Sequence, residues 1–553
     1  MKSNKEIAAV FGLLAKLMEM WDENPFKFRS YQNAYMLIRK WPEDFGQMSK
    51  EKLDAIPGIG KAIAEKVQEI NESGTLKLLQ TFLDKTPAGV VEMLGIKGFG
   101  PKKVLTVWKD MGIESVGELL YACNENRLVQ YKGFGAKTQA ELIKNLEYYT
   151  QSQGQFLYAT AERPVAEILE YLSTTFPKAM VSEAGALRRK MPVLDRLEFV
   201  IGEVDIKERI QALENLVLDE VNLPEGGISG VYREIFPVKI YAASPDQFGN
   251  ILFQKTGSEE YVQFINSKLN LNKAFATEME LFASIEMPFW APEMREELHA
   301  ANFGNEMAVL IEDKDIKGVV HNHSKYSDGV NTLEEMAIAC QTLGYEYLVI
   351  SDHSQSAFYA NGMQEEHVIM QWREIEVLNA KMAPFKIYKS IESDILNDGS
   401  LDYPEDLLKG FDLVIASVHS NLKMDEERAT SRLLKAIENP YTTILGHPTG
   451  RLLLSRPGYP IDHKRIIDAC AAHKVAIEIN ANPQRLDIEY QWLPYAIEQG
   501  VKICINPDAH SVRGIHDIKY GVLVARKGGL TAGQCVNTMG REEFEGWLAS
   551  SKA

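Results

Sequence analysis

The stretch that decides the fold is G-V-V-H-N-H-S-K-Y-S-D-G, residues 318–329. A short apolar run leads into His321, Asn322 and His323, and Asp328 follows shortly after. Because residues two apart in a strand face the same side, His321 and His323 should point to one place at a strand end. Imidazole and carboxylate are typical ligands of zinc, manganese or iron. Taken alone, the stretch is a modest signal, because such histidines more often only pack in a core.

From residue 317 onward, short apolar segments alternate with helical patterns. The segments that read as strands are residues 318–321, 347–351, 386–391, 412–418, 442–446, 475–480 and 502–506. The helical patterns between them are residues 332–343, 365–382, 404–409, 426–437, 461–473 and 488–499. This alternation predicts a barrel of parallel strands, in which the chemistry lies at the carboxyl ends of the strands.

Most of the predicted strands end in residues that could bind a metal. Beyond the first strand, these are Asp352, His353, Glu392, Asp394, His419, His447, Asp508 and His510, and Glu478 belongs to the remaining strand. A lone buried histidine is usually structural, but that explanation does not suit so many strand ends together. We therefore predict a metal centre there. The remaining histidines fall away from strand ends and are interpreted as surface or packing residues: His299, His367, His463, His473 and His516.

Length and composition indicate a multidomain globular protein. The chain has 553 residues, 45% of them hydrophobic and 25% charged, and its five cysteines show no C-x-x-C pair. No apolar run approaches the roughly 18 residues of a membrane span. Residues 5–20 read as an amphipathic helix rather than a secretory signal, and residues 28–41 as a second helix. We expect reduced thiols and a cytoplasmic, nucleoid-associated protein.

The distribution of charge separates two parts of the chain. The net charge is −17, which disfavours a protein that coats nucleic acid. Residues 1–150 are nearly balanced, with 21 basic and 19 acidic residues, whereas the remainder has 39 basic and 58 acidic residues. Any contact with nucleic acid should therefore lie in the first part, and the acidic remainder suits bound cations.

A glycine-rich pattern, h-x-G-h-G with h apolar and a lysine one or two residues after it, occurs three times near the N-terminus, each time before a helix. Its predicted DNA-binding residues are Gly58, Gly60 and Lys61, then Gly98, Gly100 and Lys102, then Gly133, Gly135 and Lys137. Glycines let the backbone approach closely, and the helix start offers free N–H groups to a phosphate. The pattern favours helix-hairpin-helix DNA binding over a packing role alone, and it reads sugar-phosphate rather than bases.

These hairpins, with the segments that follow, resemble the X-family DNA polymerases over residues 1–312. A-G-A-L-R-R (residues 184–189) resembles the family's entry to the palm, and Phe248-Gly249 and Thr256-Gly257-Ser258 resemble its nucleotide-side elements. The resemblance implies a helix-hairpin-helix domain (residues 1–90), a fingers-like region (91–152), a nucleotidyltransferase palm (153–235) and a thumb-like region with linker (236–312). Strands are expected at residues 180–183, 197–202, 231–235 and 238–243.

The palm departs from the family pattern where the chemistry should lie. The family holds Mg²⁺ with three carboxylates, and those positions fall on Arg196, Glu198 and Lys239. Cations there would repel the metals, so we expect an inactive polymerase. A slipped register that uses Glu203 and Asp205 is an alternative, but it leaves Lys239 in place. The resemblance also makes Lys66 a candidate Schiff-base lysine for deoxyribose-phosphate removal.

Residues 313–553 resemble the PHP (polymerase and histidinol phosphatase) domain, a distorted (β/α)7 barrel that binds up to three metals. All nine of its usual ligand positions are filled: His321, His323, Asp328, His353, Glu392, His419, His447, Asp508 and His510. The resemblance implies Mn²⁺, Zn²⁺ or Fe²⁺ as cofactors, Glu392 as the bridging ligand, and Glu392, His353 and Arg485 as catalytic residues. Asp352 is expected to orient His353, and Lys325 is a further candidate phosphate anchor.

The resemblance as a whole implies a monomeric DNA-repair enzyme that acts on gapped, nicked or abasic DNA. It implies a metal-dependent phosphodiesterase with 3′→5′ exonuclease activity, together with cleavage at abasic sites and removal of 3′-phosphates. Three alternatives remain open: a phosphatase of small phosphomonoesters, a DNA-end scaffold with an inert barrel, and an active gap-filling polymerase.

Overall fold

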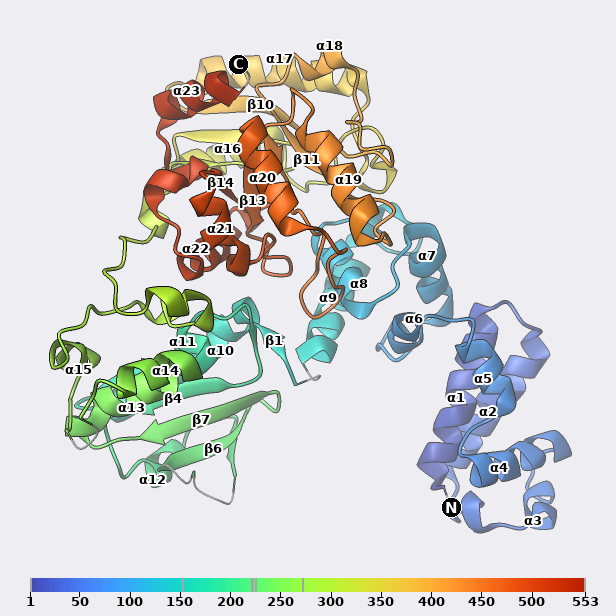
Figure 1. The fold of residues 1–553 in the computed structure, drawn as a ribbon. Helices are drawn as coiled ribbons and strands as arrows, with labels where there is room; N and C mark the ends of the chain where they lie inside the picture. Colours follow the sequence, from blue (N-terminus) through green and yellow to red (C-terminus); the bar gives the residue numbers. More distant parts are fainter. Residues whose placement is uncertain (1, 152–153, 220–222, 224–225, 271–272, 552–553) are drawn as a thin grey trace. The chain divides into compact units, whose positions relative to one another are not determined.

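The computed structural model describes residues 2–151, 154–219, 223, 226–270 and 273–551 (Figure 1). The chain forms two compact units. One comprises Met1–Asn124 with Leu128–Tyr149, and the other comprises Glu125–Arg127 with Thr150–Ala553. The boundary expected at residues 152–153 lies outside the described residues. Each unit has hydrophobic clusters of its own.

The first unit is helical throughout its described residues. Its helices are α1 (Asn4–Met20), α2 (Pro25–Lys40), α3 (Lys50–Asp54), α4 (Lys61–Ser73), α5 (Lys77–Leu83), α6 (Ala88–Met93), α7 (Pro101–Met111), α8 (Val116–Asn124) and α9 (Ala136–Gln151). Ser3 and Glu6 start α1 with a capping box, and Asn24 caps α2, which has Pro25 at its first position. The two helices expected at the N-terminus are therefore confirmed.

The second unit opens with a mixed five-stranded sheet in the order β2-β4-β7-β6-β5. Its strands are β2 (Val181–Glu183), β4 (Leu197–Ile201), β5 (Leu216–Leu218), β6 (Gly227–Tyr232) and β7 (Phe236–Ala242). Strands β4 and β7 run parallel and the other neighbours antiparallel. A shorter antiparallel pair joins β1 (Phe156–Leu157) to β3 (Val193–Leu194), and α10 (Tyr158–Thr175) contacts β2.

The strand expected over residues 231–235 was wrong in its bounds. Strand β6 ends at Tyr232, and Arg233 and Glu234 form the turn to β7 with φ of +51° and +63°. Neither residue is glycine or asparagine, the usual signals of such a turn, so the sequence pattern did not reveal it. The division expected between residues 235 and 236 also cuts this sheet, because β7 pairs with both β4 and β6.

Helices α13 (Phe248–Thr256), α14 (Glu259–Asn266) and α15 (Glu278–Ala283) follow the sheet and enclose a buried ion-pair cluster. Arg295 is fully buried, and its Nη1 lies 2.5 Å from Glu278 Oε1. Arg188, at the end of α11 (Gly185–Arg188), places Nη2 2.7 Å from the other oxygen of Glu278. A buried carboxylate with two guanidinium partners ties the expected palm entry to the expected thumb.

Replacing Arg295 with methionine is expected to lower the free energy of unfolding by about 3 kcal/mol, because Glu278 then stays buried with one cation fewer. Urea unfolding followed by circular dichroism measures the loss. The double variant Arg295→Met with Glu278→Leu should recover much of it, since the stranded charge is removed. A double variant that is no more stable than Arg295→Met would contradict this account.

The C-terminal part is a seven-stranded, nearly closed parallel barrel, as the sequence predicts. The strands are β8 (Gly318–Val319), β9 (Tyr347–Ile350), β10 (Lys386–Asp394), β11 (Leu413–Ser417), β12 (Ile444–Leu445), β13 (Ala476–Asn480) and β14 (Ile503–Asn506), each paired with the next in sequence order. A parallel bridge from Asn322 to Ala509 brings the first and last strands together.

Helices connect these strands and complete the (β/α)7 order. They are α16 (Leu333–Thr342), α17 (Glu365–Met382), α18 (Glu405–Leu408), α19 (Glu426–Ile437), α20 (His463–His473) and α21 (Leu493–Glu498), followed by α22 (Ile518–Lys527) and α23 (Arg541–Ser551). Every residue of β9, β11, β13 and β14 is buried, as in parallel sheets covered on both faces. None of the helices in the described part of the chain is long and apolar enough to cross a bilayer.

Asp517, at the N-terminus of α22, makes the stability of this unit dependent on pH. Burial raises the pKa of its carboxyl to about 7, although Lys519 and Arg513 act in the opposite direction. In the unfolded chain this carboxyl ionises near pH 4. As the pH rises from about 4 to 7, ionisation therefore favours the unfolded state progressively, and the free energy of unfolding falls. Asp517→Asn should therefore raise the melting temperature more at pH 8 than at pH 5, as measured by scanning calorimetry. An equal shift at both pH values would contradict it.

Candidate metal centre

The carboxyl ends of the barrel strands bring the nine predicted ligands into one cluster. Its members are His321, His323, Asp328, His353, Glu392, His419, His447, Asp508 and His510, and all their side chains are buried. Eight of the nine, all except His447, fall into three groups whose ligand atoms lie within 4.8 Å of one another. These are His323, Asp328, His353 and His510; His321, His323 and Asp508; and His353, Glu392 and His419. His323 and His353 each belong to two groups, so the groups are contiguous.

Glu392, near the end of β10, stands at the middle of the cluster. Its Oε1 lies 2.9 Å from His447 Nε2, 3.1 Å from His419 Nε2 and 3.3 Å from His321 Nε2. Its Oε2 lies 2.9 Å from His353 Nδ1. One carboxylate thus contacts histidines from four other strand ends, the geometry of a bridging ligand.

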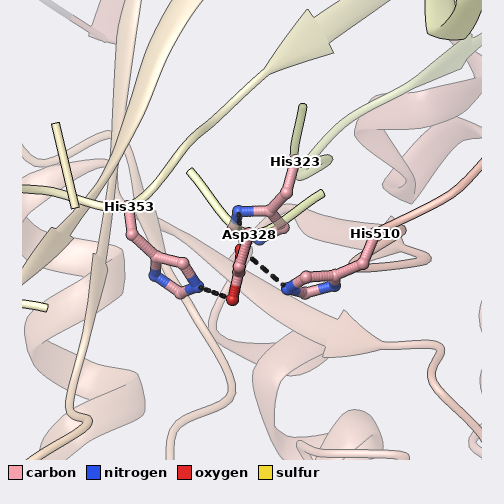
Figure 2. A group of neighbouring side chains, drawn as sticks. All are labelled: His323, Asp328, His353 and His510. Carbon is pink, nitrogen blue, oxygen red and sulfur yellow. Dashed lines mark ion pairs between the residues drawn. The ribbon is translucent and has the colours of Figure 1, made fainter. Parts of the chain in front are cut away.

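Asp328 is the counterpart of Glu392 on the other side of the cluster. Figure 2 shows His353 and His510 on either side of it, with ring nitrogens directed at its carboxylate. The distances are 3.6 Å from His353 Nε2 to Oδ2 and 3.3 Å from His510 Nε2 to Oδ1. His323 contributes the third ring, with Nδ1 4.0 Å from Oδ1.

Many polar atoms of the cluster are buried and have no hydrogen-bond partner in the protein. They are His321 Nε2, His323 Nδ1, both ring nitrogens of His353, Asp328 Oδ2, Glu392 Oε2, His447 Nδ1 and His510 Nε2. Buried polar atoms are normally satisfied, and leaving them without partners is costly. Nitrogen and carboxylate donors concentrated in this way fit divalent transition metals. The residues present therefore fit the group that the sequence predicts.

The histidines of the cluster differ in the direction of their pKa shifts. Burial lowers the pKa of His323 to about 3, and the neighbouring His510 and His353 lower it further. Burial also opposes the charged form of His419, yet Glu392 and Asp394 raise its pKa to about 10. Burial also disfavours the charged form of His510, but the carboxylate of Asp328 raises its pKa to about 10. Metal binding must displace the protons held at His419 and His510.

Buried acceptors hold the ring orientations from outside the cluster. Glu478 Oε2, on β13, lies 2.6 Å from His321 Nδ1, and Asp394 accepts from His419 Nδ1. The backbone carbonyl of Asp508 lies 2.9 Å from His510 Nδ1. Each contact leaves the opposite ring nitrogen facing the cluster. Asp394 and Glu478 stood at predicted strand ends, but their partners could not be assigned without the fold.

Asp352 does not orient His353, and that expectation was wrong. Its carboxylate instead accepts from Ser324, Ser327 and Gln371, at distances of 2.5–3.2 Å. It thereby fixes the loop that carries Asp328. The extended geometry expected for His321 was also wrong, because β8 ends at Val319 and His321 has a φ of +61°. The chain bends between strand and ligands, which strand alternation cannot express.

The structure also locates the basic side chains. Arg485 is buried, with Nε 3.9 Å from Asp508 Oδ2, whereas Lys325 is exposed. Arg127, part of this second unit, was not anticipated: its Nε lies 3.9 Å from Asp328 Oδ2 and its guanidinium 4.5 Å from the ring centroid of Tyr359. A lone arginine in a helical region carries no sequence signal of this kind.

Comparisons with known proteins agree with both parts of the chain. Residues 2–76 match the helix-hairpin-helix domain family, residues 90–147 the SAM-like helix-hairpin-helix tandem, and residues 320–482 the PHP domain. The DNA polymerase/3'-5' exonuclease PolX of Bacillus subtilis is 32% identical over 98% of this chain and 99% of its own length. The chain belongs to the X-family DNA polymerases that carry a C-terminal PHP domain. A probable phosphatase of Thermoanaerobacter sp. is 30% identical over 39% of this chain and 89% of its own length.

In this X-family chain, the palm positions do not form a metal-binding group. Glu198 and Lys239 are direct neighbours on the parallel strands β4 and β7. Glu198 Oε1 accepts from the Tyr241 hydroxyl at 2.8 Å, and Arg196 Nη2 lies 2.6 Å from Asp195 Oδ2. Within the described residues, the groups able to hold a metal all lie in the PHP barrel.

The X-family hairpins of the first unit share one backbone geometry. The first glycine of each turn has positive φ: +94° at Gly58, +79° at Gly98 and +96° at Gly133. A Cβ added at the second glycine, Gly60, Gly100 or Gly135, would meet no atom within 4 Å. The accompanying Lys61, Lys102 and Lys137 are exposed. The second glycines therefore leave open space beside a helix start, as close approach of a phosphate requires.

Lys66, the predicted lyase residue, lies on α4, with Nζ 5.9 Å from the ring centroid of Tyr31. The residue as a whole is partly buried. Deoxyribose-phosphate removal by Lys66 stays a prediction.

Proposed function

We propose that this chain is a divalent-metal-dependent 3′→5′ DNA exonuclease of DNA repair whose polymerase site is inactive. The observation that carries the proposal is the cluster of buried ring nitrogens and carboxylate oxygens at the barrel strand ends, many of which have no hydrogen-bond partner in the protein. The Bacillus subtilis relative named as a polymerase and 3'-5' exonuclease, aligned over almost the whole chain, supports it.

The reaction would be hydrolysis of the terminal phosphodiester. Water adds its oxygen to phosphorus, and the bond to the 3′ oxygen of the penultimate nucleotide breaks. Up to three divalent ions, with Mn²⁺ preferred over Zn²⁺ or Fe²⁺, would supply Lewis acidity and lower the pKa of water. Glu392 and His353 would hold these ions. Glu478 and Asp394 would keep the rings of His321 and His419 oriented toward the cluster. Arg485 would offset phosphate charge.

The hairpins of the first unit would bind the DNA. Backbone N–H groups at three helix starts, with Lys61, Lys102 and Lys137, contact phosphates without reading bases. This suits gapped, nicked or abasic DNA, and we propose that cleavage at abasic sites and removal of 3′-phosphates use the same barrel. We propose that the chain acts as a monomer.

The proposed loss of polymerase activity is supported by the charges of the side chains at the palm positions. Lys239 beside Glu198 places a cation where Mg²⁺ would bind, and Arg196 adds another. Arg188 is paired with the buried Glu278, so an incoming triphosphate would compete with an internal carboxylate. The alternative carboxylates Glu203 and Asp205 lie beyond the end of β4, and Lys239 remains opposite Glu198 in either register.

A labelled, gapped duplex incubated with Mn²⁺, with and without nucleotides, tests both parts. Wild type is expected to shorten the primer strand whether or not nucleotides are present, and chelation by EDTA should stop it. His321→Ala should be inactive, whereas His367→Ala, which alters an exposed histidine of α17, should match wild type. Extension would overturn the inactive palm, and no shortening by wild type would overturn the nuclease.

A second candidate is a phosphatase of small phosphomonoesters. The similarity of the barrel to proteins named as probable phosphatases favours it. The two candidates differ in DNA affinity: a nuclease that grips phosphates should lose affinity steeply as salt rises, because counterions are released on binding. A phosphatase would show no such DNA complex, and an inert scaffold would show the complex without cleavage.

A further inference from the structure

The loop that follows β9 forms one wall of the metal centre. Residues 354–363, called here the rim loop, begin directly after His353 and return to it, since the Met363 N–H donates to the His353 carbonyl at 2.8 Å. Ser354 and Met363 form a bridge at its base. Ser356 Oγ donates to Asp394, the residue that orients His419, at 2.9 Å. The loop is thus anchored to one candidate metal ligand, His353, and to Asp394, which orients another.

Tyr359 lies over the cluster from this loop. Its ring centroid is 6.1 Å from that of His353 and 6.2 Å from that of His419. The hydroxyl is buried and has no hydrogen-bond partner in the protein. A phenolic hydroxyl can donate a hydrogen bond, and this one has no acceptor in the protein.

Phe358, the preceding residue, has the opposite exposure. Its side chain is 83% exposed, although the residues on both sides are partly or fully buried. Large apolar side chains that stand alone are common on surfaces. Phe358, however, is next in the chain to Tyr359, whose ring contacts two candidate metal ligands. Aromatic rings beside a phosphate-binding centre are the usual platform on which an unpaired base stacks.

We propose that the rim loop receives the terminal nucleotide of DNA: the Tyr359 hydroxyl donates to a phosphate oxygen at the metal centre, and Phe358 stacks on the base. The proposal rests on the nuclease function proposed above and adds a basis for substrate choice. The guanidinium of Arg127 lies 4.5 Å from the Tyr359 ring centroid and is paired with the buried Glu125, so it supports the ring from that side. A small phosphoester has no base, so only the Tyr359 contact would serve it.

Binding is tested first, without turnover. Gapped DNA with 2-aminopurine at its 3′ terminus is titrated with wild type in EDTA, which prevents cleavage. Stacking on Phe358 should quench the fluorescence, and Phe358→Ala should lose most of the quenching while Phe358→Trp retains it. Val309→Ala, which alters a side chain that is 87% exposed elsewhere in the unit, should match wild type. Equal quenching by wild type and Phe358→Ala would overturn the stacking.

Turnover then separates the two side chains. With Mn²⁺, Phe358→Ala should raise KM for gapped DNA about tenfold and have a smaller effect on KM for glycerol 2-phosphate, which has no ring to stack. Tyr359→Phe should lower kcat for both substrates about tenfold with an unchanged metal content. Wild-type cleavage that neither variant alters would overturn this inference alone. Absence of DNA cleavage by wild type would overturn the proposed function, and the inference with it.

Discussion

Replacing Glu392 with glutamine is expected to reduce DNA cleavage by about a thousandfold or more, with loss of bound metal. Residues that only support a ligand from outside already contribute about 10–100-fold in metal affinity, and Glu392 is placed as a direct ligand. Its two oxygens contact His447, His419 and His321 on one side and His353 on the other. An amide keeps the shape but removes the charge that balances these donors.

Plasma mass spectrometry measures metal per chain, and primer shortening on gapped DNA measures activity. Glu376→Gln is the matched control, because Glu376 is exposed on α17 and pairs with Lys389 on the barrel surface. We expect the control to retain both metal and activity. A Glu392→Gln protein with full metal content and normal cleavage would show that the cluster is not the nuclease site.

Replacing Gly60, Gly100 and Gly135 together with alanine is expected to weaken binding to gapped DNA about 100-fold. Each glycine directly precedes the first residue of a helix, and an added Cβ would meet no protein atom within 4 Å. The methyl groups would instead occupy the space that a phosphate needs in order to reach the backbone N–H groups, each such hydrogen bond contributing about 1 kcal/mol. Folding should be unaffected, because the protein itself has room for them.

Fluorescence anisotropy over a range of salt concentrations measures this loss. The variant should also show a shallower dependence of affinity on salt, because fewer phosphates are contacted. Gly546→Ala is the control, since its Cβ would also meet open space but lies on α23 of the PHP barrel. A triple variant that is folded and binds like wild type would show that the hairpins are packing elements only.

Much of the barrel was predictable because its pattern is local. Buried parallel strands are continuous apolar runs, and the helices between them carry caps and periodicity, so α17 and α19 begin and end where the sequence indicates. The hairpin glycines were visible for the same reason, since a turn of this kind needs residues without Cβ at fixed places. The turn at Arg233 and Glu234 has no such signal, and it was missed.

The sequence by itself determined the barrel, the hairpins and the identity of the polar residues at the strand ends. Only the tertiary structure decided which of these residues meet. Glu392 touches histidines from four other strands, Asp352 holds Ser324 and Ser327 instead of His353, and Tyr359 reaches the cluster from a loop. Such contacts join residues far apart in the chain, and their distances depend on how the strands close into a barrel. The spacing of residues along the chain does not determine how the barrel closes. The sequence therefore identified the candidate ligands but not their partners.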